Sequence, residues 1–252
     1  MNAIVLCAGF ATRMAPLTQH IPKALLPVAD RPVIDYLMDQ LAGLPRLSTV
    51  HIVTNGRFFN HFVEWRQRWL QANGPNAFTV EIHNDGATAN ENRLGAVADL
   101  QLVVKKIGAP SRMLVSAGDN IYRFQLGPLW EQFLQGDHHR IVALPETDDN
   151  RLKKTGVLEL GDDDRVLRLV EKPRKPTSNW ICPPLYFFQP SAAARLDAFL
   201  ATSENRDAPG HFIASLCRQQ PVYAFRLAAS RLDIGSIDTY RRADRLLRRH
   251  PI

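Results

Sequence analysis

The sequence predicts an α/β fold in which short apolar strands alternate with helices and form an open, mostly parallel sheet. Two observations support this prediction. Short segments rich in Val, Ile and Leu recur five times within the first 145 residues. The segments between them carry apolar residues at helical spacing, and strands that are joined through helices are normally parallel, with helices on both faces of the sheet.

The expected elements of this first part follow in chain order. Strands are predicted over 2–7, 49–53, 79–83, 112–117 and 140–144, and helices over 32–43, 57–71, 94–106 and 126–135. The helix over 57–71 has the clearest pattern, because four aromatic side chains fall on one of its faces: Phe58, Phe62, Trp65 and Trp69. We interpret this stripe as part of the hydrophobic core rather than as a ligand site.

The pattern changes after residue 145. Strands are expected over 156–160, 166–171, 180–188 and 222–227, and helices over 191–201 and 209–218. Segment 145–150 is predicted to be a loop, and the three aspartates at 162–164 a solvated turn rather than a metal site. A turn over 233–236 opens a terminal helix that Ser236 caps. We predict one domain over 1–252, with halves 1–145 and 146–252.

The composition limits the class of protein. The chain has 252 residues, of which 45% are hydrophobic, and no apolar stretch approaches the length of a membrane span. Its three cysteines, Cys7, Cys182 and Cys217, lie far apart and form no CxxC pair. This spacing favours reduced thiols in a cytoplasmic protein over a disulfide framework or a zinc–cysteine site.

The chain is basic, with a net charge of +6. Its densest basic segment is near the C-terminus, where Tyr240, Ala243 and Leu247 recur at helical spacing among five arginines: Arg241, Arg242, Arg245, Arg248 and Arg249. We interpret the arginines as the solvated face of a helix rather than as a nucleic-acid site. The positive charge would instead attract small anionic substrates. The histidines have no identifiable partners and are expected at the surface.

The first motif with chemical meaning lies between residues 4 and 28. An apolar strand leads into a loop of small residues around Gly9, Arg13 follows in the loop, and Lys23 comes ten residues later. Small residues let backbone N–H groups approach an anion, and the two cations neutralise its charge. The segment therefore suits a polyphosphate. It fits neither a Walker pattern nor a dinucleotide fingerprint, because prolines interrupt any helix that would start at the loop.

Three further motifs carry charged side chains at the ends of predicted elements. Asp119, in Gly118-Asp119-Asn120, follows a strand and could bind a divalent ion, since Mg²⁺ prefers oxygen ligands. Glu171 and Lys172 end another strand and could bind a sugar hydroxyl and a phosphate. Asp233, before the terminal helix, offers a second carboxylate to a metal. Each motif alone is also compatible with an ordinary solvated turn.

Together the four motifs resemble the sugar-phosphate nucleotidyltransferases, such as glucose-1-phosphate thymidylyltransferases, in which they occur in the same order. The resemblance covers nearly the whole chain. It implies a Rossmann-like α/β/α sandwich with a mixed, mostly parallel central sheet, the nucleotide-diphospho-sugar transferase fold. It also implies an enzyme that joins a nucleoside triphosphate, with dTTP or UTP favoured, to a sugar 1-phosphate, using Mg²⁺. The first half would bind the nucleotide and the second the sugar phosphate.

The resemblance assigns roles to matching positions. Arg13 would hold the departing phosphates, Lys23 the reacting phosphate, and Asp119 and Asp233 the Mg²⁺. The nucleotide would contact the residues of a second set: Leu6, Ala8, Gly9, Asn84, Gly95 and Gly118. The sugar phosphate would contact a third set: Gly156, Glu171, Lys172 and Arg206. The partners would be these two substrates, without nucleic acid or membrane, and the sequence leaves a homo-oligomer open.

Two departures from the family pattern bear on structure. Ala11 stands where the family usually has glycine, so a positive φ at this position would strain the backbone. Pro183-Pro184 replaces a glycine of the sugar-side strand.

Three alternatives stay open on the sequence alone. The chain could be a cytidylyltransferase acting on a non-sugar phosphate of the phosphocholine type. It could be a non-catalytic regulatory homologue that binds nucleotide sugars. The third alternative, a nicotinamide-dependent oxidoreductase, is disfavoured by the irregular loop after Gly9.

Overall fold

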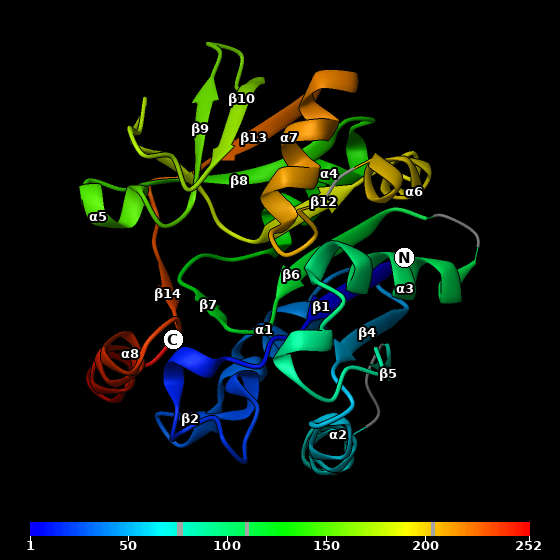
Figure 1. Ribbon diagram of the computed structural model, residues 1–252, viewed down its shortest axis with the longest axis vertical. Helices are drawn as coiled ribbons and strands as arrows, with labels where there is room; N and C mark the ends of the chain where they lie inside the picture. The colour runs from blue at the N-terminus through cyan, green and yellow to red at the C-terminus, as the bar shows by residue number, and fades with distance from the viewer. Residues whose placement is uncertain (75–77, 109–110, 203–204) are drawn as a thin grey trace. The chain divides into compact units, whose positions relative to one another are not determined.

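The computed structural model describes residues 1–74, 78–108, 111–202 and 205–252 (Figure 1). The chain forms two compact units, each built from separate stretches of sequence. The first unit comprises Met1–Arg93, Ala117–Gly127 and Arg231–Ile252, and the second comprises Leu94–Ser116 and Pro128–Ser230. The units do not follow the sequence halves 1–145 and 146–252, because Arg231–Ile252 groups with the N-terminal segment and Leu94–Ser116 groups with the second unit.

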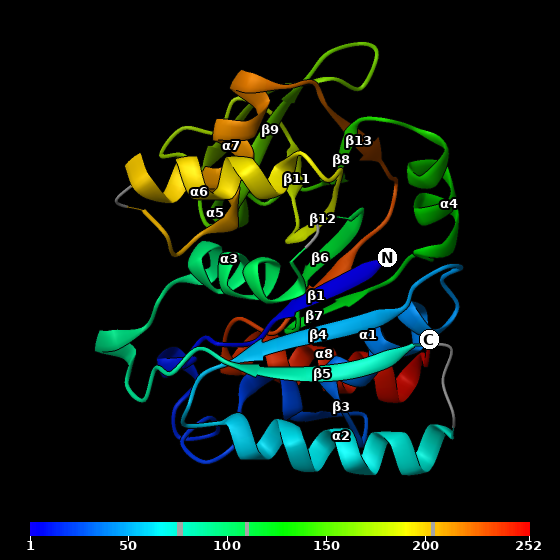
Figure 2. The same ribbon diagram turned by 90° about the vertical axis from the view of Figure 1, so that its right-hand side faces the viewer.

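The first unit contains three parallel strands in the order β1-β4-β5 (Figure 2). They are β1 (Asn2–Leu6), β4 (Thr49–Thr54) and β5 (Thr79–Asn84). Most side chains of β1 and β4 are buried, as expected for parallel strands. The carboxyl ends of the three strands lie at the same edge, which is where ligands bind in folds of this kind.

Helices α1 (Val33–Ala42) and α2 (Phe59–Asn73) belong to this unit. The aromatic stripe of α2 is buried as predicted, with every member at most 5% exposed: Phe58, Phe62, Trp65 and Trp69. Trp65 donates from Nε1 to Oδ1 of Asp35 on α1 over 2.8 Å, which satisfies its one polar atom. The stripe is therefore a structural core and not a ligand site.

The unit also contains a short antiparallel pair that was not predicted. β7 (Asn120–Tyr122) pairs with β14 (Arg231–Asp233), and α8 (Ile237–Arg249) follows. As predicted, Ser236 caps α8, accepting from Thr239 N over 3.2 Å. The five arginines of α8 are exposed and Ala243 and Leu247 are buried, so the amphipathic interpretation is confirmed.

Three further short elements lie near the N-terminus. The 3₁₀ turns η1 (Thr12–Met14) and η2 (Lys23–Leu25) precede the β-ribbon of β2 (Pro27–Val28) and β3 (Arg31–Pro32). They replace the helix that a dinucleotide fingerprint would need after the loop. A third 3₁₀ turn, η3 (Asn90–Asn92), follows β5.

The second unit holds a mixed sheet in the order β10-β9-β11-β8-β12-β6, with β13 parallel to β8. Its strands are β6 (Met113–Ala117), β8 (His139–Pro145), β9 (Gly156–Leu160), β10 (Val166–Glu171), β11 (Trp180–Cys182), β12 (Leu185–Phe188) and β13 (Val222–Arg226). The other pairings are antiparallel. Figure 1 shows β9 and β10 as a hairpin, whose turn contains the three aspartates as predicted.

The single strand predicted over 180–188 is wrong. Pro183 and Pro184 divide it into β11 and β12, which pair with different parts of β8. Proline has no N–H to donate to a strand ladder, so a pair of prolines interrupts the strand. Leu185 N instead donates to Pro183 O over 2.7 Å in a tight turn.

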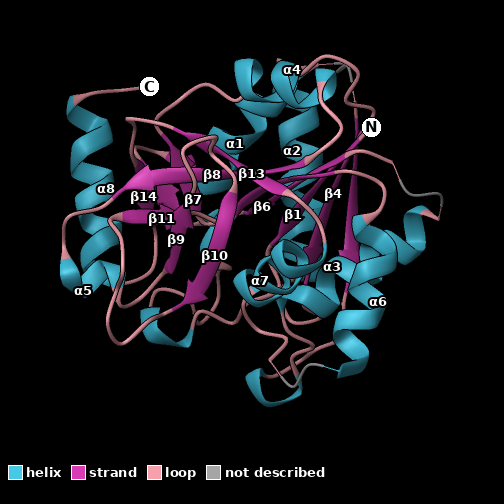
Figure 3. Ribbon diagram, turned by 90° about the horizontal axis from the view of Figure 1, so that it is seen from above, coloured by secondary structure: helices cyan, strands magenta, loops and turns pink. Residues whose placement is uncertain are grey.

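The helices of the second unit are α3 (Ala96–Ile107), most of α4 (Gly127–Gln135), α5 (Asp149–Leu152), α6 (Ala192–Thr202) and α7 (Pro209–Gln219). The first half of short α5 lies within segment 145–150, which was predicted to be a loop, and the Asp148 side chain caps this helix. α6 and α7 lie side by side (Figure 3), where Phe199 and Phe212 meet edge to face. No helix among the described residues is long and apolar enough to cross a membrane.

The expectation of surface histidines is wrong for three of them. His51, His83 and His139 are at most 8% exposed. His139 has polar partners inside the second unit: its Nδ1 accepts from Gln189 N over 3.1 Å, and its Nε2 lies 3.2 Å from Gln220 Oε1. Residue type alone predicted the surface, but hydrogen bonds within the core satisfy this ring.

Candidate active site

Strand pairing in the first unit brings Asp119 and Asp233 together. Asp233 lies opposite Asn120 in the β14–β7 pair. Asp119 therefore lies only one position away from the residue that faces Asp233. Ile234 N donates to the Asp119 carbonyl oxygen over 3.1 Å and continues the pairing. The sequence predicted both carboxylates but not the strands that align them.

Lys23, in η2, extends into the same place. Its Nζ forms an ion pair with Oδ2 of Asp119, and each side chain is about one-fifth exposed. Burial acts to lower the pKa of Lys23, but the charges of Asp119 and Asp233 outweigh it and raise that pKa. Burial acts to raise the pKa of Asp119, and Lys23 and Arg231 reverse the effect, so the pKa of Asp119 lies below its usual value.

Asp233 differs from Asp119 although the two carboxylates are neighbours. Loss of water around its carboxylate and the negative charge of Asp119 raise the pKa of Asp233, against the opposing charges of Arg231, Lys23 and Arg13. Arg13, in η1, is exposed and close enough to influence both Lys23 and Asp233. The four predicted residues thus form one charge cluster, which we define as Arg13, Lys23, Asp119 and Asp233.

The donor set of the charge cluster fits a hard divalent cation. Mg²⁺ in nucleotide sites is usually bound by one or two carboxylates together with phosphate oxygens. Asp119 and Asp233 supply two carboxylates, and Arg13 and Lys23 supply charge for phosphates beside them.

The loop after β1 leaves backbone accessible beside this cluster. Cys7 N donates to Val53 O over 2.8 Å, and the buried Asn55 side chain donates to Ala8 O over 2.9 Å, so the loop is fixed from below. Gly9 is exposed, and a Cβ placed on it would have no atom within 4 Å. Internal packing therefore does not require glycine here, whereas the close approach of a ligand to the backbone would.

Gly118 has the opposite character. Its N–H donates to Leu6 O over 3.1 Å, and a Cβ would overlap Cys7 Sγ and lie 3.2 Å from a methyl carbon of Val5. Glycine is required because β1 and the start of the Asp119 turn approach each other at this point. Cys7 is therefore a packing residue of the site that the sequence did not reveal.

We expect the substitution Gly118→Ala to lower the free energy of unfolding by about 1–3 kcal/mol, because the added methyl group displaces Cys7 or the Asp119 turn. Thermal unfolding measures the effect. The double variant C7A/G118A removes the overlapping sulfur and should recover most of the loss. Gly127→Ala, where a Cβ meets nothing within 4 Å, serves as the control. Equal stability of G118A and G127A would contradict the overlap.

Ala11 has a left-handed backbone conformation, with φ 49° and ψ 39°. This is the positive φ at which the sequence analysis expects strain for a residue other than glycine. Its carbonyl oxygen accepts from Met14 N over 2.9 Å and from Thr18 Oγ1 over 2.9 Å, so the turn is fixed from both sides. A residue with a Cβ in this conformation costs about 1–2 kcal/mol relative to a right-handed one. The predicted strain is present.

The substitution Ala11→Gly is therefore expected to raise the free energy of unfolding by about 0.5–1 kcal/mol, after the greater entropy of glycine in the unfolded chain is subtracted. The melting temperature should increase by about 1–4 °C. Ala89→Gly is a matched control, because Ala89 is exposed and extended at φ −142°, and its replacement should only destabilise. A lower melting temperature for A11G would show that the left-handed turn carries no strain.

The other predicted nucleotide residues are divided between the units. Asn84 ends β5 in the first unit, where its Oδ1 accepts from Gly86 N over 2.8 Å in a turn. Gly95 directly precedes α3 in the second unit, with φ 91°, and a Cβ there would lie 2.7 Å from Arg206 O. Val97 N donates to the same carbonyl over 3.0 Å. The start of α3 therefore packs directly against the backbone of Arg206.

The predicted sugar-side residues lie in the second unit. Glu171, at the end of β10, is the register partner of Gly156 at the start of β9. A Cβ on Gly156 would lie 3.0 Å from Glu171 Oε2, and one on Gly210, at the start of α7, would overlap that oxygen. Two glycines therefore make room for this carboxylate, and the sequence identified only Gly156. Lys172 is exposed, with φ 49°.

Comparison with known proteins shows the family of the chain. A family model described as "Nucleotidyl transferase" matches residues 2–250. The chain belongs to the nucleotidyl transferase family. Among curated relatives, a Sulfolobus acidocaldarius protein named for mannose-1-phosphate guanyltransferase is 29% identical over 201 residues, covering 78% of this chain and 51% of the relative. A UTP–glucose-1-phosphate uridylyltransferase of Haloferax volcanii is 26% identical over 247 residues, covering 93% and 91%.

Solved structures with high similarity confirm the predicted fold. An apo UDP-glucose pyrophosphorylase matches with a TM-score of 0.81 and 18% identity, covering 100% of this chain and 99% of that chain. A UTP-bound UGPase from Acinetobacter baumannii matches with a TM-score of 0.78 and 19% identity, covering 99% and 94%. The chain spans about half the length of the first curated relatives that it matches.

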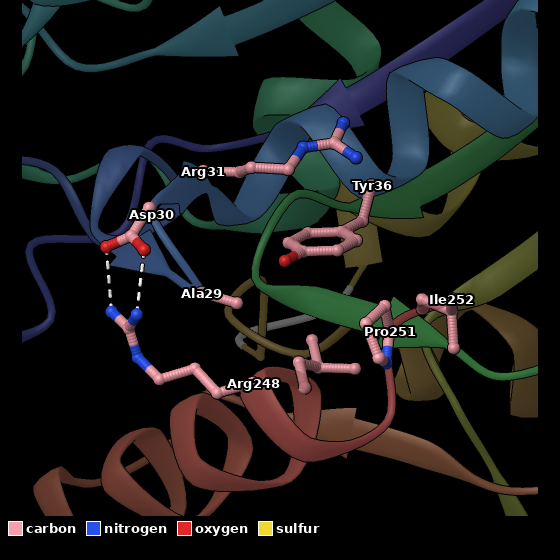
Figure 4. A pocket seen from close by; sticks show the side chains of 8 residues that line it. Ala29, Asp30, Arg31, Tyr36, Arg248, Pro251 and Ile252 are labelled. Atoms are coloured by element: carbon pink, nitrogen blue, oxygen red, sulfur yellow. Dashed lines mark hydrogen bonds and ion pairs between the residues drawn. The ribbon is translucent and has the colours of Figure 1, made fainter.

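The first unit of the chain has an open pocket elsewhere (Figure 4). Ala29, Arg31, Tyr36 and Leu247 line it, and an Arg248–Asp30 ion pair of 2.7 Å lies at its margin. None of the predicted site residues lines this pocket. The paired carboxylates and cations lie in the charge cluster and not in this pocket.

Two polar neighbours of the charge cluster escaped the sequence analysis. Asn120 donates from Nδ2 to Asp119 Oδ1 over 2.6 Å, and its own Oδ1 accepts from Arg231. Asn120 belongs to a motif that the sequence had identified, but Arg231 precedes the motif of Asp233 without a signal of its own. Asn120 thus bonds one oxygen of the Asp119 carboxylate, Lys23 pairs with the other, and Arg231 holds the Asn120 amide.

Proposed function

We propose that this chain transfers the nucleotidyl group of a nucleoside triphosphate, UTP or dTTP, to a sugar 1-phosphate and releases pyrophosphate. The observation that carries the proposal is the charge cluster of Arg13, Lys23, Asp119 and Asp233 in the first unit. The uridylyltransferase named among the relatives and the UTP-bound neighbour support this class of reaction.

The chemistry requires no general base. A phosphate monoester has a second pKa of about 6, so at neutral pH the attacking oxygen is already deprotonated. The obstacle is repulsion between this dianion and the triphosphate. The reaction therefore depends on positioning and on neutralisation of charge, which cationic side chains and carboxylate-held metal provide.

The first unit supplies residues for the triphosphate. Arg13 would bind the departing phosphates and Lys23 the α-phosphate, so Lys23 would exchange its Asp119 partner for substrate. Asp119 and Asp233 would hold Mg²⁺, which when bound would add positive charge beside the phosphate oxygens. The nucleoside would contact the backbone around the β1 loop and the β5 end: Leu6, Ala8, Gly9, Gly118 and Asn84.

The second unit supplies residues for the sugar phosphate. Glu171, with space kept around it by Gly156 and Gly210, would accept hydrogen bonds from sugar hydroxyls. Lys172 would bind the phosphate. The predicted role of Arg206 has weaker support, because its Nη2 donates to Leu200 O over 3.3 Å within its own unit.

Pyrophosphate release tests the proposal directly. Purified protein is incubated with Mg²⁺ and each of ATP, GTP, CTP, UTP and dTTP, against several sugar 1-phosphates and phosphocholine. We expect pyrophosphate and nucleotide sugar in equal amounts, with a preference for UTP or dTTP. Turnover with CTP and phosphocholine alone would instead identify a cytidylyltransferase. The absence of turnover, with binding of nucleotide sugar retained, would support a regulatory homologue.

A further inference from the structure

Strands β4 and β5 carry a second group of possible metal ligands within the first unit. His51 on β4 is the direct register partner of Glu81 on β5, and His83 follows Glu81 by two residues. Successive side chains of a strand alternate between faces, so residues two apart share a face, and cross-strand partners do so as well. The three side chains must therefore converge on one face of the sheet.

The three ligand atoms lie close together. His51 Nδ1 is 3.0 Å from His83 Nε2 and 3.3 Å from Glu81 Oε2, and His83 Nε2 is 3.7 Å from the same oxygen. A tetrahedral ion with bonds of about 2.0–2.1 Å holds its ligand atoms about 3.3 Å apart. The triangle has this size, so an ion could contact all three atoms without movement of the strands. Across the described parts of the chain, this is the one such group of histidine, cysteine or acidic residues.

Hydrogen bonding alone explains the triangle of ligand atoms less well than a bound cation does. Both imidazoles are buried, and the residues that flank His51 on β4, Val50 and Ile52, are buried as well. A neutral imidazole pair shares one proton between the facing nitrogens, which leaves the carboxylate oxygen facing a second lone pair. A cation at the centre of the triangle would satisfy all three atoms.

We propose that His51, Glu81 and His83 form a binding site for a first-row transition ion, zinc in the first instance, that joins β5 to β4. Two imidazoles and one carboxylate form a ligand set typical of zinc, with water in the fourth position. The Glu81 side chain is 55% exposed, which gives the ion and the water access from solvent. These residues are not among the carboxylates proposed to hold Mg²⁺, so this inference does not depend on the proposed reaction.

Metal titration of the whole, tag-free chain tests the site. After removal of metals by chelation, Zn²⁺ is titrated by calorimetry in the presence of Mg²⁺. We expect one zinc per chain and a melting temperature that rises with free zinc. Co²⁺ in place of zinc should give the visible absorption of a tetrahedral nitrogen and oxygen site. Sulfur-to-cobalt charge transfer would instead identify a cysteine site and overturn the assignment.

Variants locate the binding. His83→Gln and Glu81→Gln should each weaken zinc binding by more than about 10–100-fold, the loss typical of an altered outer-shell partner, because each change removes a direct ligand. His250→Gln and Glu131→Gln are controls, because both residues are exposed elsewhere in the chain. Glu81 is exposed and its replacement isosteric, so E81Q should fold even if H83Q does not. Unchanged zinc affinity in E81Q, or no stoichiometric binding by the unmodified chain, would refute the proposal.

Discussion

The variant Asp119→Asn is expected to lose at least about 1,000-fold in kcat, while its fold is retained. Asparagine keeps the size of the side chain and its hydrogen bond to Asn120, but it removes the negative charge that pairs with Lys23. The charge cluster would then hold a divalent ion through Asp233 alone. Steady-state pyrophosphate release at saturating Mg²⁺ measures the loss.

Asp162→Asn is the matched control for this prediction. Asp162 is exposed in the turn between β9 and β10, and the same substitution there should leave kcat unchanged. Thermal unfolding of both variants separates loss of activity from loss of structure. Turnover by D119N within about tenfold of the unmodified chain, at ordinary Mg²⁺, would remove Asp119 from the proposed metal site.

The variant Lys23→Met is expected to lower kcat/KM by about 100–1,000-fold, the usual effect of removing one donor that stabilises charge in the transition state. Methionine retains much of the apolar stem of lysine but not its charge. The same change leaves the Asp119 carboxylate without its ion-pair partner, so its pKa should rise. Initial rates over a range of UTP and sugar 1-phosphate concentrations measure the effect.

Lys154→Met, at an exposed position, should leave kcat/KM unchanged and serves as the control. The double variant K23M/D119N adds a sharper test. Because Lys23 and Asp119 contact each other, their effects should not multiply, and the double variant should be only slightly slower than D119N. Fully multiplicative losses would show that the two residues act independently.

Most of the fold was predictable, because long amphipathic or apolar segments carry their own signal. The strand of Asn2–Leu6 and the helix of Phe59–Asn73 were predicted to within two residues at each end. The β7–β14 pair was not predictable, since each strand has three residues and its partner lies more than a hundred residues away. Only tertiary contact gives these short segments their structure.

In the candidate site, too, residues in motifs were predictable and contacts between distant segments were not. Arg13, Lys23, Asp119 and Asp233 were recognisable from motifs, and the structure brings them together in one unit. Their supporting contacts were not recognisable, because Cys7 beside Gly118 and Gly210 beside Glu171 depend on close approach of distant backbone. The buried histidines were missed for a related reason, since a lone His in a strand gives no signal of the partner on the next strand.

In the proposed reaction, the protein side chains position and neutralise two phosphorylated substrates for a single displacement, without a protein nucleophile. The stereochemistry at the α-phosphorus tests it most directly, using UTP with a chiral α-thiophosphate and a sugar 1-phosphate as acceptor. One in-line displacement predicts inversion of configuration in the nucleotide-sugar product. Retention of configuration would require two displacements through a covalent enzyme intermediate and would contradict this account.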